Sequence, residues 1–415
     1  MSSSVAVPRP VIPARLLLRI GAMFSFETAI VAAYSPLLSL YMQQKLGLSP
    51  YEMALIYATG PLMALIAPLC AGFVADRLLP AERSLALVNL LRGAALFFAA
   101  RAGSFQELML AMAMVGFCST PSTVLASSIM FHHLPDARGF GYARVWGVAS
   151  WMVTVWAVSA FLAHFGHGAQ TAQLAFGLEL GALLAVGLGI YALTLPHTPP
   201  TGLGRGPLEA VAAVGLLRQR DLLALFVVAM ATGAMFQMHM ILQGLFFTSP
   251  SGLGLDAAAA NSATTVAQVP ELVLFPLLSL LLARFGLRTL LFVGVAAWPL
   301  RFAANAVGQP AALVVLVQLL HGFNVVFGMF AIQMAADRLA PLGRRASTQA
   351  LMTTASAGFG ALIGQLTCGA LLGAFSGPGG TNWTAIYCVP LTLGLFASAV
   401  LYFGFRPSSA APTPS

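Results

Sequence analysis

Charged side chains are scarce in this sequence. Asp, Glu, Lys and Arg make up 8% of its 415 residues, whereas soluble domains use about 25% to keep their surfaces solvated. Hydrophobic residues make up 59%, so we expect most of the protein surface to face a medium in which charged groups are unfavourable. This composition excludes a water-soluble globular protein and predicts a chain embedded in a lipid bilayer.

Cysteines and catalytic motifs are also sparse. The four cysteines, Cys70, Cys118, Cys368 and Cys388, fall in apolar segments, and their spacing indicates neither a disulfide framework nor a metal site. No Ser/His/Asp set, metal-ligand spacing or phosphate-binding glycine loop occurs outside the apolar segments. We therefore expect no enzymatic activity, no cofactor and no metal.

Long apolar stretches fill most of the chain. About 20 apolar residues are enough to cross the hydrocarbon core of a bilayer as a helix. Twelve stretches meet this requirement, at 17–43, 51–75, 84–103, 106–131, 142–165, 171–195, 222–248, 257–283, 288–307, 311–336, 347–374 and 383–404. The sequence therefore predicts an all-α membrane protein with twelve transmembrane helices.

The formal net charge of +8 is unevenly distributed. Sixteen basic residues lie in the N-terminal tail, in the loops after even-numbered spans or in the C-terminal tail, whereas the other loops hold only Lys45 and Arg101. Basic residues are retained on the cytoplasmic side, so we expect a multi-pass inner-membrane protein with both termini in the cytoplasm. The charge is then topological and predicts no nucleic-acid binding. The first dozen residues contain no apolar stretch typical of a removable signal peptide.

A polar segment at 196–221, rich in Pro and Gly, predicts a cytoplasmic linker between two bundles of six helices. The N-terminal bundle is then 17–195 and the C-terminal bundle 222–404, with cytoplasmic tails at 1–16 and 405–415.

The two halves share a weak internal repeat. The third span contains LRGAA from Leu91, and the ninth contains LRFAA from Leu300. Repeated halves that flank a site at mid-depth are typical of alternating-access carriers. We therefore expect two pseudo-symmetric six-helix bundles.

The segment between the second and third spans carries Gly72, Asp76 and Arg77 in the spacing G-x-x-x-D-R. It resembles the cytoplasmic loop signature of the major facilitator superfamily, in which the glycine permits close helix approach and the charged pair lies at the helix ends. The resemblance implies a transporter whose two bundles rock around a central site.

Further segments resemble the nucleoside:proton symporter family. They read RVWG from Arg144, QVPE from Gln268, RFG from Arg284, LHG from Leu320 and RASTQA from Arg345. The phenylpropionate permease-like branch shares several of these motifs and is the alternative. The lactose permease family shares features around the fifth span.

This resemblance implies a substrate site on the fifth and eighth spans. Gln268 and Glu271 are three residues apart on one helical face and would bind the substrate, with an ion pair between Glu271 and Arg301 as the alternative. Arg144 and Trp151 would hold the ligand, the indole ring stacking on a planar base. A topological role for Arg144 and a packing role for Trp151 are the alternatives.

The seventh and tenth spans carry further polar side chains. Gln237 matches an amide position of the family, and His239 is an addition to its pattern. His321 and Asn324 lie one turn apart and are expected to reach the same cavity. The family often has an acidic residue shortly after the position of Val325, but this sequence has none there, which puts proton coupling through that position in doubt.

Charged residues inside spans are costly and mark functional sites or paired charges. Glu27 in the first span and Glu271 in the eighth are candidate proton carriers, because desolvation penalises the charged form of a carboxylate. A fixed ion pair is the alternative for Glu27. For Arg92, Glu179 and Arg301, on peripheral spans, we expect pairing between helices.

Together these features predict a secondary active transporter that takes up nucleosides, or similar small polar solutes, with protons. Its partners are then the solute, protons and the lipid bilayer, and we expect a monomer. A carrier of aromatic acids or sugars is one alternative. A solute sensor that no longer transports is another.

Overall fold

The computed structural model describes residues 13–77, 79–134, 137–165, 173–199, 214–341 and 344–405, apart from the side chains of 66–77, 131, 137–144 and 345–346. Helices dominate these ranges. The strands found in them, β1 (Ser376–Gly377) and β2 (Gly380–Thr381), form a short antiparallel hairpin. The predicted all-α membrane fold is confirmed.

The helices before the linker follow one another with short connections. They are α1 (Ala14–Leu40) with its π-helical extension η1 (Tyr41–Lys45), α2 (Pro50–Arg77), α3 (Ala81–Arg101), α4 (Phe105–His133), α5 (Ala137–Phe165) and α7 (Phe176–Ala192).

The helices after the linker are more often interrupted by 3-10 and π-helical turns. They are η2 (Gly215–Arg218), α9 (Arg220–Thr248), α10 (Ala257–Thr264), η3 (Thr265–Gln268), α11 (Val269–Val307), α12 (Ala311–Leu316), η4 (Val317–Leu319), α13 (Leu320–Phe323), η5 (Asn324–Phe330), α14 (Ala331–Leu339), α15 (Arg345–Thr353), η6 (Thr354–Gly360), α16 (Ala361–Phe375) and α17 (Trp383–Gly404).

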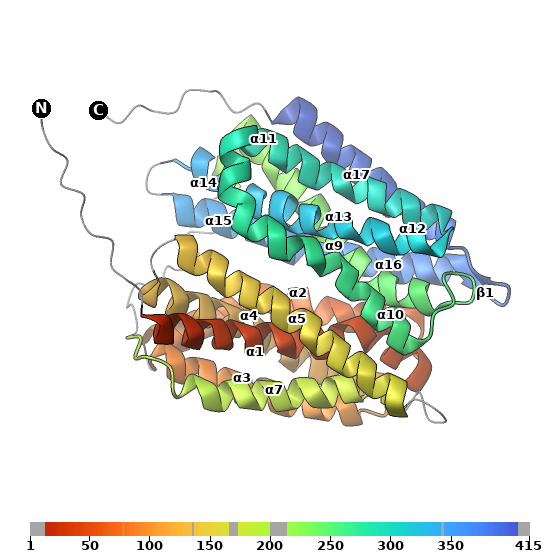
Figure 1. The fold of residues 1–415 in the computed structure, drawn as a ribbon, viewed down its shortest axis with the longest axis horizontal. Coiled ribbons are helices and arrows are strands. Elements are labelled where there is room, and N and C mark those ends of the chain that lie inside the picture. Colours follow the sequence, from red (N-terminus) through yellow and green to blue (C-terminus); the bar gives the residue numbers. More distant parts are fainter. Residues whose placement is uncertain are drawn as a thin grey trace, which may run out of the picture.

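Helix occupies every interval in which the sequence predicts a span. Within the described ranges, nine helices are long and apolar enough to cross a membrane. One of them, 257–307, covers two predicted spans, and the chain turns back on itself inside α11 (Figure 1). Gly286 lies in this turn with φ 76°, a left-handed conformation that glycine adopts without steric cost.

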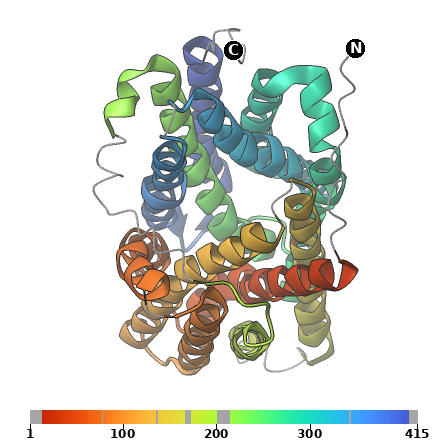
Figure 2. The same cartoon turned by 90° about the vertical axis from the view of Figure 1, so that its left-hand side faces the viewer.

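The helices form two groups that lie side by side. Figures 1 and 2 show α1–α7 in one group and α9–α17 in the other, with the start of α1 and the end of α17 at the same end of the molecule. Much of the predicted linker, 200–213, lies outside the described residues, as do the tails 1–12 and 406–415. The start of the linker is held by α3, because Glu82 accepts hydrogen bonds from the backbone N–H of Thr198 and from His197.

Small residues bring helices into close contact inside each half. A Cβ on Gly177 of α7 would lie 2.4 Å from the carbonyl oxygen of Ala33 in α1. A Cβ on Gly294 of α11 would lie 2.2 Å from the backbone nitrogen of Gly328 in η5. Such contacts replace the hydrophobic driving force that helices lack inside a membrane, so each half is closely packed.

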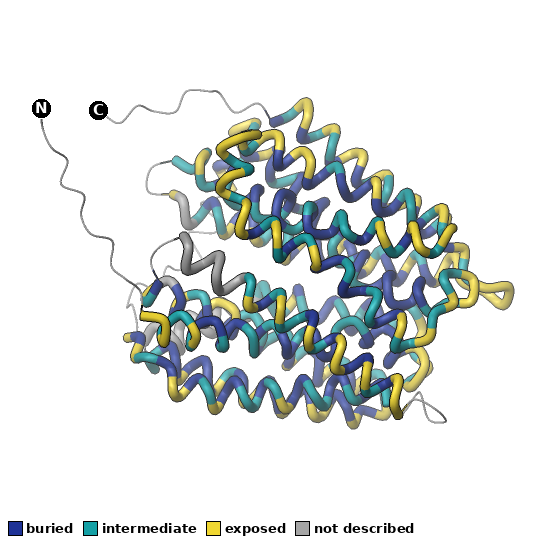
Figure 3. The backbone as a smooth tube through the Cα atoms, viewed as in Figure 1, coloured by how far each residue is buried: buried dark blue, intermediate teal, exposed yellow. Residues whose placement is uncertain are grey.

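Exposed residues recur along the outer helices (Figure 3), and many of them are large and apolar. Phe98 is 68% exposed, Leu110 72%, Leu183 68% and Leu300 61%. A soluble protein rarely exposes apolar surface on this scale. The outer face is therefore suited to contact with lipid.

Candidate substrate site

A cavity of ≈ 420 Å³ lies between the two halves. The first half contributes Thr28 of α1 and Trp151 of α5. The second half contributes residues from α9, η3, α11, α13, η5, α14 and η6, among them Phe236, Gln268 and Glu271. The volume is in the range of cavities that enclose small organic ligands.

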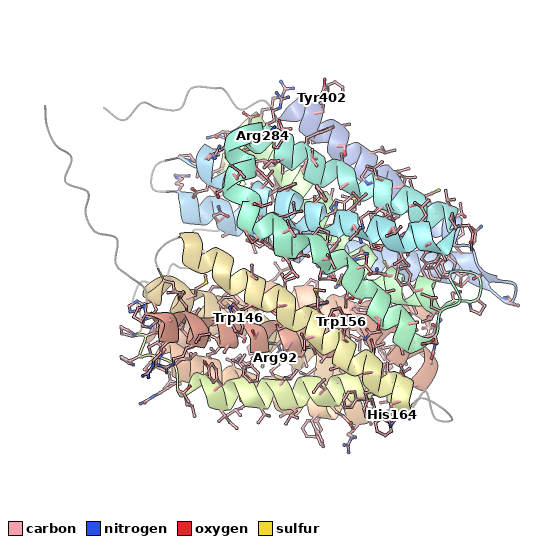
Figure 4. All side chains as sticks on the ribbon, in the orientation of Figure 1. Arg92, Trp146, Trp156, His164, Arg284 and Tyr402 are labelled. Carbon is pink, nitrogen blue, oxygen red and sulfur yellow. The ribbon has the colours of Figure 1, made fainter. Side chains whose placement is uncertain are left out.

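Beyond Trp151 on α5, side-chain hydrogen bonds join the two halves at the end of the molecule away from the start of α1. There, Asn261 of α10 donates hydrogen bonds to the carbonyl of Val155 and the hydroxyl of Ser159 on α5, at 3.1 and 2.9 Å. The indole of Trp156, labelled in Figure 4, donates to Thr265 at 3.0 Å. We call these contacts between α5 and the α10–η3 segment the seam.

Towards the termini, the cavity continues along α14, where its lining includes Gln333. Helix α1 begins and α17 ends at that end of the bundle (Figure 1). The lining of the cavity therefore extends from the seam towards the end of the bundle at which α1 begins.

Gln268 and Glu271 lie on the cavity wall where η3 passes into α11. Both are buried, with 8% and 7% of their surface exposed. The side-chain oxygen of Gln268 has no hydrogen-bond partner among the described residues. A buried amide oxygen without a partner costs free energy, so this position is suited to accept a hydrogen bond from a ligand.

Trp151 faces the same cavity from α5, one helical turn after Val148, which also lines it. The indole nitrogen of Trp151 is buried and has no partner in the described part of the chain. Its ring offers an apolar face and its N–H a donor for a ligand. Arg144 lies on α5, but its side chain is outside the described residues, as are those of Gly72, Asp76 and Arg77 on α2.

His321 completes the polar side of the cavity from α13. Its ring lies over that of Phe236, with the centroids 5.9 Å apart. The Nε2 atom is 3.8 Å from Oε1 of Glu271, and Nδ1 is 3.1 Å from the guanidinium of Arg301. His321 thus links the cavity wall to a layer of buried residues behind it.

The layer behind the wall is centred on Arg301, which is 1% exposed. Arg301 donates to Gln318 at 2.7 Å, to Asn324 at 3.0 Å and to a ring nitrogen of His239 at 3.1 Å. Among the described residues, no carboxylate lies within ion-pair distance of this guanidinium. The Arg301–Glu271 ion pair considered from the sequence is therefore absent, and His321 lies between the two side chains.

Some predicted site residues do not line the cavity. His239 and Asn324 are buried around Arg301, behind the wall. Gln237 accepts a hydrogen bond from Gln365 of α16 at 3.3 Å and lies off the cavity lining. The sequence reasoning also missed Gln318, although its position three residues before His321 is a signal that both lie on one helical face.

The first half contains a second buried arginine, Arg92 of α3, which lies among the helices of that half (Figure 4). Its guanidinium is 3.3 Å from Glu27. Glu27 also accepts hydrogen bonds from Ser122 and Thr123 of α4, at 2.8 and 3.0 Å. This arrangement corresponds to the fixed ion pair that the sequence left open for Glu27.

Glu179 pairs with Arg101 at 3.2 Å, as expected for charges on peripheral helices. Both side chains are substantially exposed, at 41% and 59%. An exposed pair of this kind contributes at most about 1 kcal/mol to stability.

Comparison with known proteins decides the family. Residues 14–410 match the family described as nucleoside H⁺ symporter. The chain belongs to this family. It is therefore a membrane transporter and not an enzyme, and the resemblance to nucleoside:proton symporters is confirmed over the phenylpropionate permease-like alternative.

Individual relatives agree with this assignment. The chain is 26% identical to the xanthosine permease of Escherichia coli (strain K12), over 94% of this chain and 96% of that protein. It is 24% identical to the nucleoside permease NupG of the same organism, over 94% and 95%. A crystal structure of the nucleoside transporter NupG superposes with a TM-score of 0.79 at 21% identity, covering 95% of this chain and 100% of that one.

Proposed function

We propose that this transporter carries nucleosides across the inner membrane together with protons, with both termini in the cytoplasm. The observation that carries the proposal is a central cavity whose wall combines aromatic rings, a buried carboxylate, and polar atoms of Gln268 and Trp151 that have no partner among the described residues. A nucleoside has a planar base that stacks and a sugar whose hydroxyl groups both donate and accept. The printed names of the relatives, a xanthosine permease and a nucleoside permease, support this class of substrate.

The cavity offers matching groups on its two sides. Trp151 on the first half and Phe236 on the second present ring faces for the base. Gln268 and Glu271 accept hydrogen bonds from sugar hydroxyls or base edges. Because these groups come from both halves, a bound ligand contacts both halves at once. Ligand binding then favours a concerted movement of the two halves.

Coupling to protons requires a group whose proton affinity differs between the two states of the cycle. We assign this role to Glu271, which lies on the cavity wall of the state seen here. Glu27 remains a second candidate, although its pairing with Arg92 supports a structural role. Arg144 remains a candidate ligand for the substrate, and Gln237, His239 and Asn324 act through the packing around the site.

Uptake of labelled uridine into proteoliposomes tests the proposal. We expect accumulation above the external concentration when an inward proton gradient is imposed, and only equilibration when a protonophore dissipates it. Competition by other nucleosides, but not by phenylpropionate or a disaccharide, is expected from the stacking and hydrogen-bonding groups. If uptake does not depend on the proton gradient, the transporter is not coupled to protons. If phenylpropionate competes better than nucleosides do, the substrate is an aromatic acid and not a nucleoside.

Trp151 gives a prediction for the binding step. Trp151→Ala removes the stacking surface, which contributes about 1–3 kcal/mol per base, so we expect uridine binding to weaken roughly 5- to 150-fold. Trp151→Phe keeps a ring and is expected to bind more tightly than the alanine variant. Ligand-dependent thermal stabilisation of the purified protein measures both affinities. Equal affinity of Trp151→Ala and the unaltered protein would show that the base does not stack there.

A further inference from the structure

Arg301 occupies an unusual environment for a cation. It is 1% exposed inside a membrane helix, where an ionised side chain is costly unless compensated. Its bonded acceptors, Gln318, Asn324 and the two histidines, carry no formal negative charge. The face of Trp298, 5.2 Å from the guanidinium carbon, adds a cation–π contact. Within the described residues, the positive charge is therefore solvated by the protein without being neutralised by a direct ion pair.

The hydrogen bonds of Arg301 fix the protonation of its neighbours. A guanidinium has donors and no acceptor, so the Nδ1 atom of His321, 3.1 Å from Nη1, accepts a hydrogen bond. A ring nitrogen that accepts cannot carry a proton, and the proton of neutral His321 is then on Nε2. The same argument makes His239 neutral, because one of its ring nitrogens accepts from Nη2.

This tautomer directs His321 towards the cavity. Its Nε2–H lies on the side of Glu271, with Nε2 3.8 Å from Oε1, within reach of a hydrogen bond after a small movement. A second proton on His321 would have to bind Nδ1. That would break the bond to Arg301 and place two positive charges in contact. His321 is therefore poorly suited to carry a proton.

We propose that Arg301 is a positioning residue for proton coupling: it holds His321 as a neutral donor and thereby makes Glu271, on the opposite side of that ring, the group that binds and releases the transported proton. This inference rests on the proposed function. It assigns the proton to one carboxylate and gives the neighbouring histidine a role that does not involve titration.

Ionisable groups pack near Glu271 from several elements. On the second half they are His321 of α13, Arg301 of α11 itself, His239 of α9 and Tyr387 of α17. His239 packs against the ring of His321, and Tyr387 stacks on Phe302 of α11; neither side chain lines the cavity. On the first half, the side chain of Arg144 of α5 lies outside the described residues. The proposal requires no change in the charge of any of them.

The test uses proteoliposomes, with uridine as the probe and uptake measured as a function of pH. In Arg301→Gln the guanidinium no longer occupies Nδ1 of His321, so that ring becomes able to bind a second proton. Proton-dependent uptake should then persist to higher pH, with its midpoint raised by about one unit towards the range of histidine. Arg301→Lys keeps the charge and should restore the midpoint towards that of the unaltered protein. Arg288→Gln removes an exposed arginine of the same helix and is the matched control, with an unchanged midpoint.

The histidine distinguishes the outcomes further. His321→Gln cannot titrate, so retained uridine-driven proton flux in this variant supports Glu271 as the carrier. It also provides a readout if Arg301→Gln does not fold. Loss of that flux in His321→Gln, together with its retention in Glu271→Gln, would overturn the proposal. So would an unshifted midpoint in a folded Arg301→Gln protein. Absence of uridine-driven proton flux in the unaltered protein would instead refute the proposed function.

Discussion

Glu271→Gln is expected to abolish proton-driven accumulation of uridine while leaving exchange of uridine across the membrane in place. Glutamine has the shape of the protonated acid and cannot bind or release the proton, so the gradient of protons is no longer linked to that of the substrate. One charge-assisted hydrogen bond becomes a neutral one, which costs about 1–1.5 kcal/mol and weakens binding roughly tenfold. In proteoliposomes the internal uridine concentration should therefore reach the external value and stop there.

The exposed carboxylate Glu179 provides the control for this experiment. It lies on α7 in the first half, paired with Arg101, and Glu179→Gln should accumulate uridine like the unaltered protein. Exchange measured with saturating uridine on both sides shows whether Glu271→Gln still cycles. If the variant continues to concentrate uridine under a proton gradient, another group carries the proton.

The ion pair between Glu27 and Arg92 gives the largest expected effect on stability. Glu27→Gln leaves a buried guanidinium without its counter-charge, and breaking a buried pair from one side costs about 3–5 kcal/mol. The expected result is a markedly lower midpoint of thermal unfolding in detergent. The double variant Glu27→Gln/Arg92→Met removes both charges and should recover much of the loss, since apolar replacement of a whole pair is often neutral.

The same variant also tests the other role considered for Glu27. A carboxylate that carries the transported proton would show, in Glu27→Gln, loss of accumulation with little loss of stability. Loss of stability with proton coupling retained in the folded fraction would assign Glu27 to the framework of the first half. The two results exclude each other, and measuring unfolding and uptake on one preparation separates them.

The architecture was accessible from the sequence because it depends on patterns that extend over many residues. Apolar stretches predicted where helices occur, even though two of them are joined within one element, α11, that turns at Gly286. Short motifs also predicted residues of the site where polar side chains recur at a helical spacing. Gln268 and Glu271, three residues apart, both lie on the cavity wall.

The rotation of single helices was harder to infer. Thr232, Phe236 and Met240 of α9 line the cavity at intervals of four residues. Gln237 and His239 are each one position from this row, which turns them about 100° away from it. An almost uniformly apolar helix gives no periodicity from which that rotation could be read. The sequence therefore identified polar residues near the site, but not which side of the helix each of them occupies.

The pairing of charges could not be predicted either, because it depends on contacts between distant helices. Arg92 and Arg301 occupy equivalent places in the repeated LRGAA and LRFAA segments. Only Arg92 meets a carboxylate, Glu27, within the described residues. The repeat thus preserved the position of the arginine in both halves, while its surroundings diverged: a paired charge in one half and neutral acceptors in the other.

The seam has a consequence for how fast the transporter can change state. Its bonds join amide, hydroxyl and indole groups, namely those of Asn261, Ser159, Trp156 and Thr265. Each group can exchange its partner for water when the halves separate, so little free energy is lost on opening. Neutral bonds are also insensitive to ionic strength. Separation of the two halves at the seam should then be nearly independent of the salt concentration outside the membrane.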